Sequence, residues 1–316
     1  MENKIKISVI IPAYNVANYI GKTIQSVLNQ TFVDYEVVVV DDGSSDETGV
    51  ICDRLAENNS QISVIHQENG GVMAARLKGV KISKGEWITF LDGDDRLPPD
   101  SLLLLYNAAI NKNVDLVWGT RATIDDDDNI LYTEKKPVVG YFDNNMYTKI
   151  ISSNPRSLHG MLFRKHVVSE PIVIDRKITN GEDQLYNLLI SNRVHNAYSI
   201  ANIVHFYINR CDSATKRKVQ NDYWYLFISY VVECYKKYGV NELAYQRFIL
   251  TRVNSIIRNS TEIIDCSNTC FESLKKIHYS ILFNIKINLI LFVLKHPYKV
   301  LIHIMRMHPT RILKIL

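Results

Sequence analysis

Residues 36–44 read EVVVVDDGS, and residues 87–95 read WITFLDGDD. In both stretches a short run rich in β-branched and aromatic residues ends abruptly in acidic residues and glycine. Such runs predict buried strands of a parallel sheet, with the acids at the carboxyl end of each strand. Residues 7–11, ISVII, form a third run of this kind, which Pro12 ends.

Helical patterns lie between these runs. Apolar spacing predicts helices over 20–30 and 71–84, and residues 62–66 predict another strand. Ser44 and Glu47 match a capping box, which predicts that a helix begins there. Regular alternation of strands and helices predicts an α/β fold, a mostly parallel sheet flanked by helices.

The polar clusters that follow the strands are expected to meet. In open parallel sheets, ligands bind outside the carboxyl ends of the strands. Three clusters fall there: Pro12–Asn15, Asp41–Ser44 and Asp92–Asp95. Topology therefore predicts a ligand site at one edge of the sheet, built from segments far apart in the sequence.

The acids in two of these clusters suggest what is bound. Asp92 and Asp94 are separated by one residue, and carboxylate oxygens suit Mg²⁺ or Mn²⁺ bridging a diphosphate. The alternative is a turn with solvated acids. Asp41 and Asp42 are read either as acceptors for a base N–H or a ribose hydroxyl, or as turn-forming residues.

Five motifs in fixed order carry a family resemblance. They are VIIPAYNVANYIGKTIQSVLNQT, VVVVDDGSSDET, ENGGVMAARLKG, GEWITFLDGDD and GEDQ. Over roughly residues 5–215 the chain resembles the family 2 glycosyltransferases of the GT-A fold. Within that family it looks like the bacterial enzymes that build capsular, exopolysaccharide or cell-wall glycans.

The resemblance implies a mechanism and the residues that carry it. The donor is expected to be a nucleotide-sugar of the UDP-sugar type. The configuration at the anomeric centre of the sugar is expected to be inverted in a single displacement. Asp183 would be the general base, and Asp92 and Asp94 would hold the Mg²⁺ or Mn²⁺ ion. The residues expected around the donor are Pro12, Ala13, Tyr14, Asn15, Asp41, Asp42, Arg76, Asp92, Asp94 and Arg210.

Some of these assignments have open alternatives. Arg210 or Lys216 would supply positive charge to the diphosphate, unless both belong to a basic surface loop. His159 either faces the acceptor or packs as a partly buried residue. His205 is expected in the core, with metal ligation as the alternative.

Charge is distributed unevenly along the chain. The 316 residues carry a net charge of +4, which does not suggest a nucleic-acid partner. Residues 271–316 hold eight Lys or Arg and one acid, a balance of +7, so the residues before Phe271 sum to −3. The sequence predicts a catalytic domain over 1–215 and a helical C-terminal region over 216–316.

The basic tail is also apolar, but its longest uninterrupted apolar run, Leu289–Leu294, is too short to span a bilayer. We expect interfacial helices on an anionic membrane. A packed helical subdomain and contact between copies of the chain are the alternatives. The expected location is the cytoplasm, peripheral on the inner face of the cell membrane, with a glycan or lipid-linked oligosaccharide as acceptor.

The cysteines and the first residues agree with that location. Five cysteines without framework spacing predict reduced thiols, and Cys266 with Cys270 lacks two further metal ligands. The first apolar run is too short for a signal peptide, which predicts no export.

Two other functions remain as alternatives to a hexosyl- or N-acetylhexosaminyltransferase. A nucleotidyltransferase would have a glycine-rich phosphate loop after the first strand, where this chain has PAYN. A non-catalytic subunit of a glycan-assembly complex would have lost its acids, yet Asp92, Asp94, Glu182 and Asp183 are all present.

Overall fold

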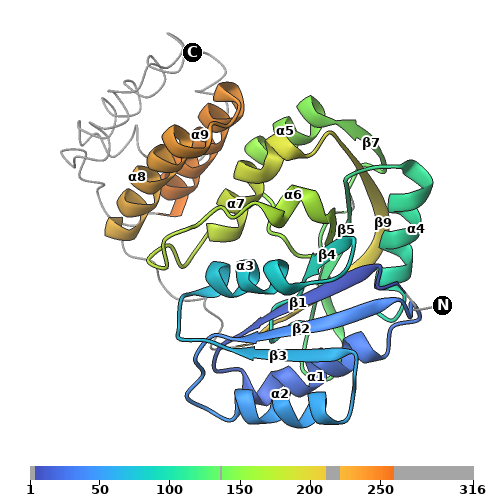
Figure 1. The fold of residues 1–316 in the computed structure, drawn as a ribbon. Coiled ribbons are helices and arrows are strands. Elements are labelled where there is room, and N and C mark those ends of the chain that lie inside the picture. Colours follow the sequence, from blue (N-terminus) through green and yellow to red (C-terminus); the bar gives the residue numbers. More distant parts are fainter. Residues whose placement is uncertain (1–3, 136, 211–220, 260–316) are drawn as a thin grey trace. The chain divides into compact units, whose positions relative to one another are not determined.

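The computed structural model describes residues 4–135, 137–210 and 221–259 (Figure 1). It confirms the α/β fold. The predicted strands are β1 (Ile7–Ala13), β2 (Tyr35–Asp41), β3 (Ile62–His66) and β4 (Trp87–Phe90). The helices between and after them are α1 (Ala17–Leu28), α2 (Thr48–Glu57), α3 (Val72–Ile82) and α4 (Ser101–Lys112). The basic tail, Cys266 and Cys270 lie outside the described residues.

One continuous sheet joins these strands to the rest of the domain. Its further elements are β5 (Leu116–Ile124), β6 (Ile130–Thr133), β7 (Gly140–Asp143), α5 (Asn144–Ser153), β8 (Met161–Arg164), α6 (Lys165–Ser169), α7 (Glu182–Ile190), the 3₁₀ turn η1 (Ser191–Arg193) and β9 (Asn196–Ile208). The strand order is β3-β2-β1-β4-β8-β5-β9-β7, with β6 beside β5. β8 is antiparallel to both β4 and β5, so β5 and β9 run in the same direction as β1.

Every residue of β1, β2 and β4 is buried, so both faces of the sheet are covered there, which explains the continuous apolar runs. Val9 and Ile11 belong to the core that α1 and α4 cover. Ile10 points the other way, toward α3, where a Cβ on Gly79 would lie only 2.4 Å from Ile10 Cγ2. Glycine therefore lets α3 pack closely against β1.

The predicted capping box at the start of α2 is wrong. Glu47 makes no side-chain capping bond, and Ser44 Oγ instead accepts the backbone N–H of Asn15 at 3.0 Å. At the start of α2, Asp46 supplies the side-chain hydrogen bonds instead. Its carboxylate accepts hydrogen bonds from the backbone N–H groups of Thr48 (3.0 Å) and Ala17 (3.1 Å). The loops after β1 and β2 are thereby tied together.

The described residues divide into two compact units. Residues up to 147 together with 156–210 form the first, and residues 148–155 with 221–259 belong to the second. In the second unit α8 (Asn221–Tyr238) and α9 (Glu242–Asn259) pair through the stacked rings of Tyr235 and Tyr245, whose centroids are 4.2 Å apart. Among the described helices, none has the length and apolar character needed to cross a membrane.

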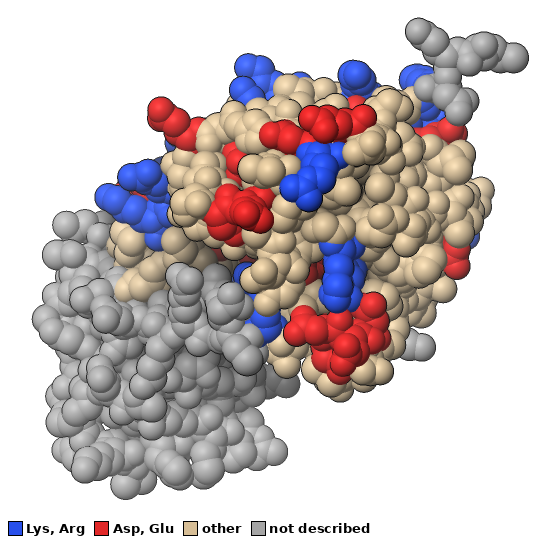
Figure 2. Space-filling model, turned by 90° about the horizontal axis from the view of Figure 1, so that it is seen from below, with Lys and Arg blue, Asp and Glu red and all other residues tan. Residues whose placement is uncertain are grey.

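Charged side chains on the face shown in Figure 2 are mixed in sign. Acidic and basic groups lie interspersed among uncharged residues there, so the described part of this face presents no broad surface of one charge.

Candidate active site

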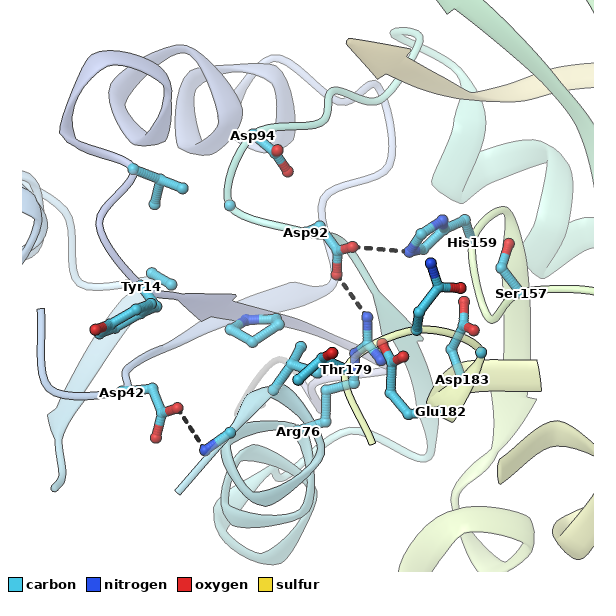
Figure 3. A pocket seen from close by; sticks show the side chains of 18 of the residues that line it. Tyr14, Asp42, Arg76, Asp92, Asp94, Ser157, His159, Thr179, Glu182 and Asp183 are labelled. Carbon is cyan, nitrogen blue, oxygen red and sulfur yellow. Dashed lines mark hydrogen bonds and ion pairs between the residues drawn. The ribbon is translucent and has the colours of Figure 1, made fainter. Parts of the chain in front are cut away.

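A cleft with a volume of about 800 Å³ lies at the carboxyl ends of β1, β2 and β4. Segments between Ser157 and Gln184 form its other wall. Clefts of this size bind small molecules. The structure brings the following sequence-predicted residues into its lining: Pro12, Ala13, Tyr14, Asp42, Arg76, Asp92, Asp94, Asp183 and Arg210. Figure 3 shows Tyr14 and Asp42 on one side, Glu182 and Asp183 on the other, and Asp92 and Asp94 between them.

Two other predicted residues, Asn15 and Asp41, are absent from the lining of this cleft. Asn15 has a φ of 51° and its Oδ1 accepts the N–H of Ser45 at 2.8 Å. Asp41 is buried, and its oxygens contact Ser44 N (3.1 Å) and His66 Nδ1 (2.9 Å). Both side chains shape the loops that carry their neighbours Tyr14 and Asp42.

Asp42 is fixed at the beginning of α3. Its Oδ1 accepts from Gln67 Nε2 at 2.7 Å and from Gly70 N at 2.9 Å, and its Oδ2 accepts from Gly71 N at 2.8 Å. Three donors leave a carboxylate with room for about one further hydrogen bond. Asp42 can therefore contact a ligand while holding the loop around Gly70 in place.

Asp92 is held between two cationic side chains. Arg76, only 2% exposed, donates from Nη2 to Asp92 Oδ1 at 2.7 Å, and His159 Nε2 lies 3.0 Å from Asp92 Oδ2 (Figure 3). Burial alone would raise the pKa of Asp92, but Arg76 and His159 outweigh it and hold this pKa well below its usual range. Burial lowers the pKa of His159, but its contact with Asp92 and the charges of Asp92, Asp95 and Asp183 together outweigh burial and raise this pKa to about 9.

Asp94 and Asp95 have different partners. Arg210 Nε lies 2.7 Å from Asp94 Oδ2, and fully buried His205 contacts Asp95 Oδ2 through Nε2 at 2.8 Å. Burial, with the charges of Asp95 and Asp92, raises the pKa of Asp94 to about 7. His205 is thus a core residue paired with an acid, as its strand context predicted.

The acids of this segment fit a divalent cation. Ligand oxygens of Asp92, Asp94 and Asp95 lie within 4.8 Å of one another. Hard carboxylate oxygens are the donors that Mg²⁺ and Mn²⁺ prefer. Both oxygens of Asp92 are already engaged by Arg76 and His159, so Asp94 is the acid best placed to ligate an ion by exchanging its pairing with Arg210.

Glu182 and Asp183 occupy the first turn of α7. Gly181 precedes them with a φ of 87°, and the positive end of a helix dipole favours acids at this position. Asp183 Oδ1 accepts the N–H of Gln184 at 2.7 Å. Burial and then the Asp183 charge raise the pKa of Glu182 to about 7.

Several lining residues were not identified from the sequence. Arg121 stands on β5, where it pairs with Glu134 at 2.5 Å and lies over the Tyr207 ring at 5.4 Å. Gln184 Oε1 is buried and has no hydrogen-bond partner among the described residues. The other unpredicted lining residues include Asn69, Ser157, Arg176, Lys177 and Thr179. The GEDQ motif, with Asp183, and His159 were the sequence signals that pointed to part of this wall.

Comparison with known proteins places the chain among sugar-transferring enzymes. The model of the family described as glycosyl transferase family 2 matches residues 8–170. Glycosyltransferase GlyG of Streptococcus pneumoniae serotype 4 is 37% identical over 127 residues, which cover 40% of this chain and 42% of GlyG. Chondroitin synthase of Pasteurella multocida is 38% identical over 126 residues, which cover 40% of this chain and 13% of the synthase. The chain thus matches less than half the length of either relative.

Solved structures of S. aureus TarS share the fold. The structure of TarS 1–349 in complex with UDP-GlcNAc has a TM-score of 0.65 at 20% identity, covering 89% of this chain and 79% of that one. A second TarS structure gives a TM-score of 0.67 at 16% identity, over 96% of this chain and 55% of that one. This likeness confirms the fold that the motifs implied. Because the family model spans more than half of the 316 residues, the chain belongs to glycosyl transferase family 2.

Proposed function

We propose that the protein is an inverting glycosyltransferase that moves a sugar from a UDP-sugar to a hydroxyl of a glycan acceptor. The observation that carries the proposal is that Asp94 and Asp183 line the same cleft from separate elements. A cation-binding acid and a second, separately placed carboxylate are the two groups that such a displacement needs.

The donor nucleoside is assigned to the side of the cleft formed by Tyr14 and Asp42. Tyr14 is 51% exposed, which leaves its ring available for stacking on a base. Asp42 retains capacity for one hydrogen bond from a base N–H or a ribose hydroxyl. The UDP complexes of TarS support uridine as the nucleoside, since that protein shares the fold.

A Mg²⁺ or Mn²⁺ ion, held by Asp94 with Asp92 nearby, would neutralise charge on the departing diphosphate. Arg76 and His159 keep Asp92 ionised and oriented. Arg210, now paired with Asp94, would turn its charge to the diphosphate when Asp94 changes partner.

Asp183 is the proposed general base. Its carboxylate takes the proton from the acceptor hydroxyl while the oxygen bonds to the anomeric carbon and the bond to the UDP oxygen breaks. One displacement inverts the anomeric centre, and no covalent sugar–enzyme bond forms. Glu182 lies beside it in the first turn of α7 and, when ionised, adds negative charge to that wall of the cleft.

We further assign residues 1–215 as the catalytic domain and 216–316 as a helical region that associates with the membrane. The charge balance of residues 271–316 supports a peripheral position on the cytoplasmic face of the cell membrane and a lipid-linked acceptor for bacterial surface polysaccharide. In a flotation assay, full-length protein should rise with anionic vesicles at low salt. Protein that stays behind would contradict the membrane assignment alone.

Purified protein incubated with a panel of nucleotide-sugars and Mg²⁺ or Mn²⁺ tests the enzymatic assignment. We expect metal-dependent binding and slow hydrolysis of one UDP-sugar, with release of UDP. Formation of UTP and a sugar 1-phosphate when pyrophosphate is added would indicate nucleotidyl transfer instead. Failure to bind any nucleotide-sugar would favour a non-catalytic subunit.

A further inference from the structure

Three side chains with metal-ligating chemistry meet at the edge of the sheet opposite the cleft. Asp115 precedes β5, His195 precedes β9, and His166 lies in α6, directly after β8. β5 and β9 are parallel neighbours and β8 is antiparallel to β5, so these three strand ends share one edge. Arg121, which lines the cleft, lies six residues after Asp115, about 20 Å of extended chain.

The ligand atoms of the three residues are close together. His195 Nδ1 lies 2.9 Å from Asp115 Oδ2, and His166 Nε2 lies 3.8 Å from Asp115 Oδ1. One nitrogen from each histidine and one Asp115 oxygen all fall within 4.8 Å of one another. In a tetrahedral zinc site with bonds near 2.0 Å, neighbouring ligand atoms are about 3.3 Å apart. The two distances above, which run to different oxygens of the Asp115 carboxylate, lie on either side of this value.

The backbone around Asp115 holds this arrangement in place. Asp115 N donates to Asn196 O at 3.1 Å, and Arg164 N donates to Asp115 O at 2.7 Å. Asp115 Oδ2 also accepts the backbone N–H of His195 at 2.9 Å. The ligands are therefore carried by strand ends that are hydrogen-bonded to one another, whereas the exposed imidazoles of His166 and His195 remain open to solvent.

Ring orientation distinguishes this cluster from the buried histidine pair. His159 and His205 are stacked with an interplanar angle of 5°, so lone pairs in their parallel ring planes cannot converge on one ion. The rings of His166 and His195 are inclined at 37°, with centroids 6.2 Å apart. Their planes intersect, and a single ion beside Asp115 can lie near both.

We propose that Asp115, His166 and His195 bind one Zn²⁺ ion at a site separate from the cleft. Two imidazoles and a carboxylate favour Zn²⁺ over Mg²⁺, and solvent supplies the fourth position. Arg164 Nε lies 3.8 Å from Asp115 Oδ1, but the guanidinium also lies over the Trp87 ring, and its Nη1 lies 3.7 Å from Glu86 Oε1, which offsets its charge. The ion would join the ends of β5, β8 and β9.

Zinc titration of the full-length protein, in excess Mg²⁺, tests this site by calorimetry. The variant is the double substitution His166→Gln and His195→Gln, whose wild-type side chains are 48% and 79% exposed. It should bind one equivalent of Zn²⁺ fewer than wild type. Zinc bound by histidines elsewhere in the chain is the same in both proteins and cancels when the two stoichiometries are subtracted. The zinc-dependent rise in unfolding temperature should be lost with it, because an ion bound to the folded state stabilises that state.

His66→Gln is the matched control. His66 also contacts two carboxylates, Asp41 and Asp53, but through opposite ring nitrogens, and it should keep the wild-type zinc stoichiometry. Co²⁺ gives a second readout, a visible absorption band of tetrahedral type that the double variant loses. Should the double variant fail to fold by circular dichroism, each single substitution is expected to weaken zinc binding by about tenfold or more. Equal stoichiometry and affinity in wild type and variants would overturn the proposal.

Discussion

His159 Nε2 lies 3.0 Å from Asp92 Oδ2, opposite the oxygen that Arg76 binds. The first acid of the strand-end motif is therefore fixed by two cations from different parts of the chain. His159 comes from the segment before β8 and Arg76 from α3, so the position of Asp92 depends on both walls of the cleft.

Replacing His159 should impair catalysis more than folding. Removing His159 leaves Asp92 Oδ2 without its charged partner, which costs about 1.5–3 kcal/mol, so His159→Ala is expected to lower kcat/KM by about 10- to 100-fold. His159→Gln should recover part of the loss through its amide N–H. Steady-state kinetics with the identified donor measure both, and the remote His166→Gln should match wild type. Unchanged kinetics in His159→Ala would show that Asp92 needs no support from this side.

Arg76 is expected to be important for stability. Removing one partner of a buried ion pair leaves an uncompensated charge, and Arg76→Ala should lower the free energy of unfolding by about 3–5 kcal/mol. Urea unfolding measures this change. Arg54→Ala, on an exposed turn of α2, should stay within about 0.5 kcal/mol of wild type. If both variants lose only a similar, small amount of unfolding free energy, Arg76 does not form a buried ion pair with Asp92.

A pair of glycine substitutions tests the packing of α3 on β1. Gly79→Ala would place a methyl group 2.4 Å from Ile10 Cγ2 and should destabilise the protein by about 1–3 kcal/mol. Gly21→Ala lies in α1 with no neighbouring heavy atom within 4 Å, so better helix propensity should raise stability by about 0.5–1 kcal/mol. Thermal or urea unfolding shows whether each variant is less or more stable than wild type. Equal changes in stability for the two variants would contradict the close packing of Gly79 against Ile10.

Glu182 should make stability depend on pH. Its pKa is about 7 in the folded protein against an ordinary value of 4.5, so the folded state binds this proton more tightly than the unfolded state. Stability is then lost as pH rises from about 4.5 to about 7. Urea midpoints across this window should fall less steeply for Glu182→Gln than for wild type, while Glu57→Gln, exposed at the end of α2, should follow wild type. Parallel curves for Glu182→Gln and wild type would refute the assignment.

The amino-terminal half of the domain could be predicted because its signals are local. Each of β1, β2 and β4 is a largely apolar run followed by polar residues. One short stretch of sequence therefore predicts the strand, its carboxyl end and the polar cluster that lies there. The distinct tasks of Asp41 and Asp42 could not be read this way. Only the fold decides which of two adjacent acids faces the loop and which faces the cleft.

Apart from Asp183 and His159, which the family resemblance pointed to, the far wall of the cleft could not be predicted, because it is assembled by long-range pairing. His159 reaches Asp92 since β8 inserts antiparallel between β4 and β5, and Arg121 meets Tyr207 since β5 pairs with β9. Residues 157–184 have no strong periodicity that would reveal this. The burial of Arg76 was equally hidden, because a charged residue in a helix usually faces solvent.

The most direct test of the proposed mechanism is single-turnover transfer by Asp183→Asn at saturating donor and acceptor, together with its affinity for the donor. A base acts in the transition state, so we expect transfer to fall by about a thousandfold or more while donor affinity stays within about twofold of wild type. Asn preserves the shape of the side chain and its bond to the Gln184 N–H. Near-normal transfer at saturation with a collapsed donor affinity would contradict the account, because Asp183 would then be a donor ligand and not the base.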